Sequence, residues 1–211
     1  MKPVFFFHEP EFFPSLQFFH GLIQSVVWVV LDHQTFQVRC YQNQCRIKTV
    51  SGIQVLRVAV KHPCNKPVYQ TMIDNFNPWK RVFMSVIKHC YGRTEYYRIY
   101  IDGLASLING PTVMLETLNV QTTMWIAGLL KAEPQLFHTH QFYGGRGSHA
   151  YPKHKVVESL CQRFHVNSFS QEFKHPFYQQ STGTFETDLS VLDALFNVGA
   201  DETRKLLMNE R

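Results

Sequence analysis

Apolar residues occur at two different spacings along the chain, and this pattern predicts both strands and helices. The runs 4–7 and 26–31 are short, rich in aromatic or β-branched residues and end at polar residues, which is typical of buried strands. In the segments 16–23 and 79–91 the apolar residues recur every three or four positions, which is typical of amphipathic helices. The same criteria predict further helices at 96–108, 112–118, 155–165, 189–196 and 202–208, and further strands at 46–48, 55–60, 68–73, 123–130 and 168–173.

Strand and helix patterns are mixed along the whole chain, which favours an α/β fold with a mixed sheet flanked by helices. The chain has 211 residues, a length that fits one domain, and no internal repeat or long linker divides it. A domain of this size buries roughly 70% of its unfolded surface, so its core needs no disulfide or metal to hold it together. We therefore predict a single domain over residues 1–211.

The cysteines and the apolar runs indicate the compartment. Five cysteines are present, an odd number, and no two of them form a Cys-x-x-Cys pair, which is typical of reduced thiols in a cytosolic protein. The apolar run 4–7 is too short for a signal peptide or a transmembrane helix, and no other run approaches the length that spans a bilayer. We predict a cytoplasmic protein without membrane insertion.

The formal net charge is +5, and the positive residues are concentrated in one stretch. No acidic residue lies between Asp32 and Asp74, although six basic residues do, and four more follow as far as Arg93. One interpretation is a solvated basic face. The other is attraction of an anionic ligand such as a nucleotide, a phosphopantetheine arm or tRNA, and charge alone does not choose between them.

Two of the predicted strands end in a histidine beside a carboxylate. Asp32-His33 ends the run 26–31, and His8-Glu9 follows the run 4–7. Sites in α/β proteins assemble at the carboxyl ends of strands, so these four residues could share one rim. His33 could act as a general base, or Asp32 could cap a helix beside a solvated His33. The four groups could also bind a metal, but their spacing matches no known metal motif, and we predict no metal.

Three polar residues of the basic stretch are candidates for ligand binding. The fork of the Arg46 guanidinium suits a phosphate or a carboxylate, and Arg39 and Asn43 lie close to it in the sequence. A surface ion pair is the alternative role for Arg46. A weaker hypothesis makes the thiol of Cys40 a nucleophile activated by His33.

Near the end of the chain, a histidine and a tyrosine flank a proline. Pro176 favours an extended backbone at His175, which predicts a fixed loop in which His175 and Tyr178 contact a ligand. Ser190 and Asp193 open a predicted helix at the spacing of a capping pair, and we interpret them as a cap. The glycine-rich segment 141–152 is either an ordinary loop or a cradle of backbone N–H groups for an anion.

The motifs at both ends of the chain give it a resemblance to a known family. Residues 9–14 read Glu-Pro-Glu-Phe-Phe-Pro, 31–36 read Leu-Asp-His-Gln-Thr-Phe, 143–147 read Tyr-Gly-Gly-Arg-Gly, and 175–179 read His-Pro-Phe-Tyr-Gln. In this order, with the run 39–47, the basic helix at 79–91 and the segment 189–193, they resemble the WbqC-like family of bacterial proteins over nearly the whole chain. Glu9 stands where that family usually has Gln, and Gln34-Thr35 where it usually has Val-Gln.

The resemblance implies a role in surface-polysaccharide or O-antigen biosynthesis, as a transferase that adds an acyl or aminoacyl group to an activated amino sugar. We expect His33, Asp32 and His175 to be catalytic, with His33 deprotonating the amine. The expected ligand is an anionic small molecule, namely a nucleotide sugar, an acyl-CoA or a carrier-bound acyl donor, with tRNA as a further candidate, and no cofactor is expected. The alternative is a noncatalytic ligand-binding or scaffold protein of the same pathway. The residues expected to bind substrate are Glu9, Arg39, Asn43, Arg46 and Tyr178.

Overall fold

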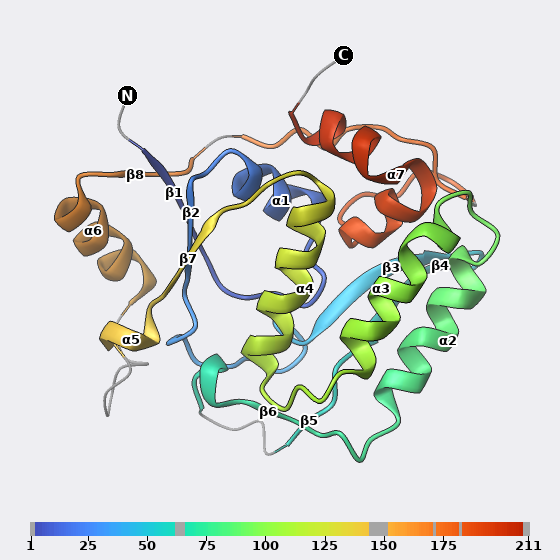
Figure 1. Cartoon of the computed structure of the whole chain (residues 1–211), viewed down its shortest axis with the longest axis horizontal. Coiled ribbons are helices and arrows are strands. Elements are labelled where there is room, and N and C mark those ends of the chain that lie inside the picture. The colour runs from blue at the N-terminus through green and yellow to red at the C-terminus, as the bar shows by residue number, and fades with distance from the viewer. Residues whose placement is uncertain (1–2, 62–65, 144–151, 171, 182, 209–211) are drawn as a thin grey trace.

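The computed structural model describes residues 3–61, 66–143, 152–170, 172–181 and 183–208 (Figure 1). A four-stranded sheet, in the order β7-β2-β1-β8, forms its centre, and every neighbouring pair in it is parallel. Because parallel sheets are covered on both faces, their strands are short continuous apolar runs, as the sequences of β1 and β2 are. The four strands are β1 (Val4–His8), β2 (Val27–Val30), β7 (Gln135–His138) and β8 (Asn167–Ser168).

Helices cover both faces of this sheet and extend the fold to one side of it. In Figure 1, α6 lies on one side of the sheet, α1 and α4 lie on the other, and α2 and α3 follow beyond α4. None of the helices formed by the described residues is long and apolar enough to cross a membrane. The helices are α1 (Leu16–Ile23), α2 (Trp79–Tyr91), α3 (Tyr97–Asn109), α4 (Leu115–Leu129), α5 (His140–Tyr143), α6 (Lys153–Phe164) and α7 (Val191–Met208).

The alternation of side chains along the strands divides the interior into two clusters. Phe6, Trp28 and Val30 belong to the larger cluster, which also contains buried side chains of α1, α4 and α7. Phe7 and Val29 point to the opposite face, where the smaller cluster includes buried residues of α6. This division matters for function, because His8 has the same orientation as Phe6 and therefore faces α1 rather than α6.

Antiparallel pairs complete the structure. β3 (Gln44–Thr49) and β4 (Gly52–Arg57) form the hairpin that Ser51-Gly52 predicts, and β5 (Val60–Lys61) pairs with β6 (Met72–Ile73). The short 3-10 helix η1 (Val68–Gln70) precedes β6. Parallel and antiparallel pairing therefore occur together with helices, and the predicted α/β class is confirmed.

Several local predictions are wrong. The predicted strand at 68–73 is divided, because Val68–Gln70 form the 3-10 helix η1 and Met72–Ile73 form the short strand β6. The predicted helix at 112–118 and strand at 123–130 form one helix, α4, because buried residues recur at helical spacing from Leu115 through Ile126 and tertiary packing overrides the β propensity of Thr122 and Thr123. The predicted strand at 168–173 is reduced to β8. The sequence analysis also missed β7, whose two apolar residues follow Pro134 and are too few for a recognisable pattern. The tip of the glycine-rich segment, at 144–151, lies outside the described residues.

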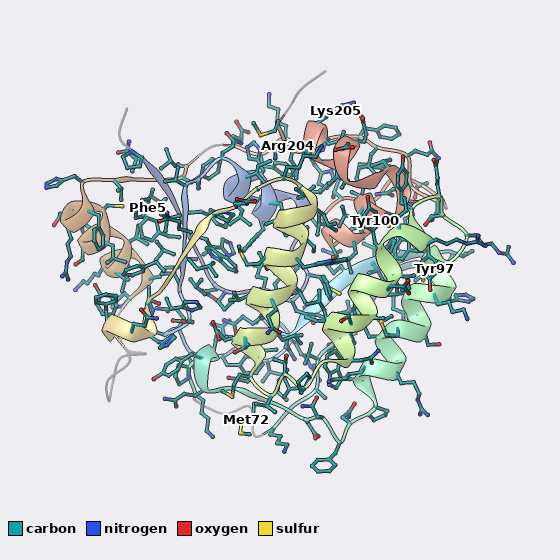
Figure 2. All side chains as sticks on the ribbon, in the orientation of Figure 1. Phe5, Met72, Tyr97, Tyr100, Arg204 and Lys205 are labelled. Atoms are coloured by element: carbon teal, nitrogen blue, oxygen red, sulfur yellow. The ribbon has the colours of Figure 1, made fainter. Side chains whose placement is uncertain are left out.

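The gap between the helices predicted at 189–196 and 202–208 corresponds to a bend at Gly199 inside α7. This glycine has φ of 79° and a non-helical ψ of 171°, so the last helix bends there. A Cβ at this position would lie 2.4 Å from the ring of Tyr96, which leaves no room for a side chain. Tyr100 of α3, labelled in Figure 2, holds the bend by accepting the backbone N–H of Ala200 at 2.9 Å.

Candidate functional site

The carboxyl ends of β1, β2 and β7 bring polar residues to one edge of the parallel sheet. His8 is opposite Val30 in the register, and Val30 is opposite His138, so the three residues form one row across the sheet. Adjacent strands are about 4.8 Å apart, which places the backbones of His8 and His138 roughly 10 Å from each other. This is the edge at which α/β proteins bind ligands.

Asp32, just beyond β2, is the centre of a hydrogen-bonded cluster. Its side chain is fully buried, and its Oδ1 accepts the backbone N–H of His140 (2.8 Å) and the hydroxyl of Thr139 (3.0 Å). Its Oδ2 lies 3.0 Å from Nδ1 of His138 and 2.5 Å from Nδ1 of His140. Burial raises the pKa of Asp32, but the hydrogen bonds from the two histidines outweigh it and lower the pKa below its ordinary value.

His138 lies between two carboxylates. Its Nδ1 is also 3.1 Å from Oε1 of Glu116, a residue of α4. The hydrogen bonds to Asp32 and Glu116 raise the pKa of His138 to about 9 against the opposing effect of burial, so the ring is cationic at neutral pH. The side chains of His138 and His140 are 21% and 33% exposed, and the ring of His140 stacks on Tyr69. The cluster therefore opens to solvent through its imidazoles.

The side chains of Asp32 and His33 both lie within hydrogen-bonding distance of the Thr139 hydroxyl, but their other surroundings differ. His33 is fully buried, with its Nδ1 2.7 Å from Oγ1 of Thr139 and its ring against Tyr143. The groups of this cluster that solvent can reach are His138 and His140, and the sequence analysis missed both. A His-Thr-His triplet directly after apolar residues was the available signal, and it was lost because β7 itself was not recognised.

A pocket of about 370 Å³ lies beside the cluster at the end of β1. His8, Glu11 and Phe18 line it, together with aromatic side chains from the segment after β8. The ring of His8 stacks on Phe6 and meets Phe18 edge to face. Its Nδ1 donates a hydrogen bond to the carbonyl of Glu9 (3.0 Å), and this leaves Nε2 as the acceptor.

The surroundings of the pocket move the pKa values of His8 and Glu11 in opposite directions. Burial lowers the pKa of His8 to about 4, and burial together with the negative charge of Glu9 raises the pKa of Glu11 to about 8. Nδ1 of His8 and Oε1 of Glu11 are 3.8 Å apart. At neutral pH the pocket therefore holds an uncharged imidazole and a protonated carboxyl group, one able to accept a proton and the other able to donate one.

The residues expected to bind substrate near β1 and β3 belong to different parts of the structure. Glu9 accepts a hydrogen bond from Gln42 (2.7 Å) and lies 4.0 Å from Lys153. The buried Asn43 donates to the carbonyl of Val58 at 3.2 Å, which is a structural contact. Arg46 is half-buried on β3, and Arg39 is exposed with φ of 64°.

His175 and Tyr178 belong to a second buried cluster, centred on Asp193 of α7. The hydroxyls of Tyr91 and Tyr178 each donate to a carboxylate oxygen of Asp193 at 2.8 Å, and the ring of His175 stacks on Tyr178. Burial raises the pKa of Asp193, although the two tyrosine hydrogen bonds and nearby Lys48 oppose the shift. The capping interpretation is confirmed for Ser190, whose Oγ accepts the backbone N–H of Leu192 at 3.3 Å. It is wrong for Asp193, because the side chain of Asp193 accepts bonds from two tyrosines instead.

Two further predictions concern the Cys40 thiol as a nucleophile and the basic stretch as a site for an anionic ligand. Burial raises the pKa of the Cys40 thiol, which opposes the thiolate that a nucleophile requires. A second, wider depression of about 1,010 Å³ is lined by Lys88, His89 and Arg93 of the predicted basic stretch, at the junction of α2 and α3. Its positive charge suits an anionic group.

Together, the parallel sheet, the imidazole–carboxylate cluster and the pocket at the end of β1 define an α/β protein with a candidate site at its strand ends. The sequence matches the family model of the WbqC-like proteins over residues 9–172 and, in an overlapping second match, 140–205. The chain therefore belongs to the WbqC-like protein family.

The chain is also similar to an individual protein. The chain is 24% identical over 199 residues to "Uncharacterized protein Rv1507c" of Mycobacterium tuberculosis (strain ATCC 25618 / H37Rv), an alignment that covers 82% of this chain and 84% of the relative. No solved structure matches the chain.

Proposed function

We propose that this protein is a transferase that acylates or aminoacylates the amine of an activated amino sugar in surface-polysaccharide biosynthesis. The single observation that supports the reaction is the pair formed by His8 and Glu11 inside the pocket at the end of β1. Their opposite pKa shifts match the acid and base that acyl transfer needs. The motifs that this chain shares with the WbqC-like family support the pathway, because that resemblance implies a role in O-antigen biosynthesis.

The walls of the pocket suit a sugar or an acyl chain. Phe6, Phe18, Phe169 and Phe173 line it and provide apolar surface, and polar side chains that include Ser15, Gln17 and Asp188 line it as well. Aromatic surface beside several polar groups suits a ligand that is itself partly polar and partly apolar. We expect the amine to sit against Nε2 of His8, with the remainder of the activated sugar extending out of the pocket.

The reaction proceeds by attack of the amine nitrogen on the carbonyl carbon of the acyl donor. A nitrogen–carbon bond forms, the bond from the carbonyl carbon to the donor's leaving atom breaks, and no electrons are lost or gained overall. Nε2 of His8 accepts the proton that the nitrogen loses, and the carboxyl group of Glu11 gives its proton to the leaving atom. Nε2 of the imidazolium then releases its proton to solvent and the Glu11 carboxylate takes one up from solvent, which restores the starting state.

This assignment places the base at His8, in a pocket that solvent reaches, rather than at His33. A general base must come within hydrogen-bonding distance of the proton it removes. His33 is fully buried against Thr139, whereas 31% of the His8 side chain is exposed.

The proposal is tested by incubating the purified chain with UDP- and dTDP-amino sugars and a panel of acyl-CoA and aminoacyl-tRNA donors. Mass spectrometry would detect the acylated nucleotide sugar. We expect Glu11→Gln to lower kcat/KM by about 100-fold, because the amide cannot deliver a proton. Glu158→Gln, on the exposed side of α6, is the matched control and should leave the rate unchanged.

Two results would count against the proposal. Full activity of Glu11→Gln or His8→Gln would remove the acid–base pair from the mechanism. Stabilisation of the chain by an amino sugar nucleotide, with no acylated product from any donor in the panel, would favour a noncatalytic ligand-binding protein instead.

A further inference from the structure

Three potential metal ligands converge at the carboxyl ends of β2 and β7. Asp32, His138 and His140 each contribute one ligand atom, and these atoms all lie within 4.8 Å of one another. Ligands around a tetrahedral zinc ion are separated by about 3.3 Å, given metal–ligand distances near 2.1 Å. Small rotations of the imidazole rings therefore suffice to bring the three atoms onto one ion.

We propose that Asp32, His138 and His140 form a binding site for a divalent transition-metal ion. This site is distinct from the His8 pocket and does not depend on the proposed acyl transfer. Its two histidines come from elements that the sequence pattern did not predict, since His138 is the last residue of β7 and His140 is the first residue of α5.

The hydrogen bonds of Asp32 orient its carboxylate as a ligand. Oδ1 is occupied by the backbone N–H of His140 and the hydroxyl of Thr139, so Oδ2 is the oxygen turned toward the two imidazole nitrogens. The Thr139 hydroxyl also lies 2.8 Å from the carbonyl of Val30, which ties the arrangement to β2. Such outer contacts fix the direction of a metal ligand before the ion arrives.

Charge and access also suit a dication. A bound ion takes the place of the proton that His138 carries at neutral pH, and Asp32 and the neighbouring Glu116 carboxylate then provide two negative charges, which match the two positive charges of the ion. Glu116 is buried, and its Oε1 lies 3.1 Å from Nδ1 of His138. The partial exposure of the two histidine rings leaves a path for the ion and room for a bound water molecule.

The donor atoms indicate which metals the site would take. Two imidazole nitrogens and one carboxylate oxygen suit Zn²⁺, Co²⁺ or Fe²⁺, whereas Ca²⁺ and Mg²⁺ prefer sites made only of oxygen. Open sites with three protein ligands, of the two-histidine and one-carboxylate type, hold catalytic zinc and non-haem iron. The first probe is therefore Zn²⁺, and Co²⁺ is its spectroscopic substitute.

The test uses the full chain, without an affinity tag and after dialysis against a chelator. Isothermal titration with ZnCl₂ should show one ion per chain, and Co²⁺ should give visible absorption bands of a protein-bound ion. His140→Gln and His138→Gln should each weaken Zn²⁺ binding by at least about 10-fold. His154→Gln, an exposed histidine of α6, is the matched control and should bind as the unmodified chain does.

Folding of the variants is checked independently. His140→Gln keeps the backbone N–H that Asp32 accepts, so its circular dichroism and its Tm without zinc should match those of the control. Zinc should raise the Tm of the control but not that of His140→Gln. Absence of zinc binding to the chelator-treated chain, or full binding by the folded double variant His138→Gln/His140→Gln, would overturn the proposal.

Discussion

Two fully buried aspartates, Asp32 and Asp193, differ in the partners that surround them. Asp32 lies at a strand end, and two of its partners are imidazoles that solvent reaches. Asp193 lies in α7, and its partners are the hydroxyls of Tyr91 and Tyr178, both of which are buried. The same residue type, with the same burial, therefore occupies an open cluster in one region and a closed cluster in the other.

The difference also appears in the pKa values. Burial acts to raise both, but at Asp32 the histidine hydrogen bonds reverse the effect, whereas at Asp193 burial prevails over the tyrosine hydrogen bonds. Imidazoles can carry positive charge and phenols cannot. The histidine partners therefore outweigh the effect of burial on the pKa of Asp32, whereas the tyrosine partners do not outweigh it at Asp193. Burial alone therefore does not set the pKa of a buried aspartate, and the chemistry of its hydrogen-bonding partners decides the direction of the shift.

The largest expected effect is on stability. Asp193→Ala leaves two buried phenol hydroxyls without their acceptor and should lower the free energy of unfolding by about 3 kcal/mol. Asp32→Ala should lower the free energy of unfolding by about half as much. The partly exposed rings of His138 and His140 can bond to water instead, and the Thr139 hydroxyl can still donate to the carbonyl of Val30. Urea denaturation with Asp201→Ala as an exposed control measures both. Equal losses of unfolding free energy for the two substitutions would show that the different partners of the two aspartates do not affect stability.

The next effect concerns the pH dependence of kcat/KM for the reaction proposed in the His8 pocket. His8 must be neutral and Glu11 must be protonated, so kcat/KM should fall below about pH 4 and above about pH 8. Beyond each limit the rate should change by about tenfold per pH unit, since one proton is involved. A pH–rate profile, with circular dichroism recorded at each pH, tests this. A rate that continues to rise above pH 8 would show that Glu11 acts as a base instead.

A smaller effect is expected in the pH dependence of stability at Asp193. Its pKa in the folded protein is raised above the ordinary value of 3.8, so the folded state holds the proton more tightly than the unfolded state does. Stability from this group is therefore present below pH 3.8 and is lost as pH rises through the folded pKa. The penalty of Asp193→Asn should be greatest in acid and shrink toward neutral pH, as urea titrations would reveal. A penalty that grows with pH would contradict this sign.

The smallest effect should follow from Glu9→Gln. The Glu9 charge raises the pKa of Glu11, but burial is the larger cause. Removing the charge should therefore move the alkaline limit of the pH–rate profile slightly downward and leave the acid limit in place. An unchanged alkaline limit would show that Glu9 does not influence Glu11 in solution, and Glu158→Gln again serves as the control.

The sequence predicted part of the candidate site and missed the rest for identifiable reasons. Asp32 and His8 were found because each follows an apolar run that is continuous and easily recognised. Glu11 belongs to the motif at 9–14, but its proposed role depends on a pKa shift caused by burial, which no local pattern reveals. His175 and Tyr178 were placed in the expected fixed loop, where the structure shows them packed beside Asp193. Their contribution to ligand binding stays a prediction.

By itself, the sequence determined the α/β class, the WbqC-like resemblance and most helices and strands, because these depend on residue spacing over short segments. Only the tertiary structure decided which polar residues meet. His138 and His140 are more than a hundred positions from Asp32, yet the parallel register of β2 and β7 brings them to the same carboxylate. Contacts of this kind depend on strand order and burial, which arise from the packing of the whole chain and leave no local pattern in the sequence.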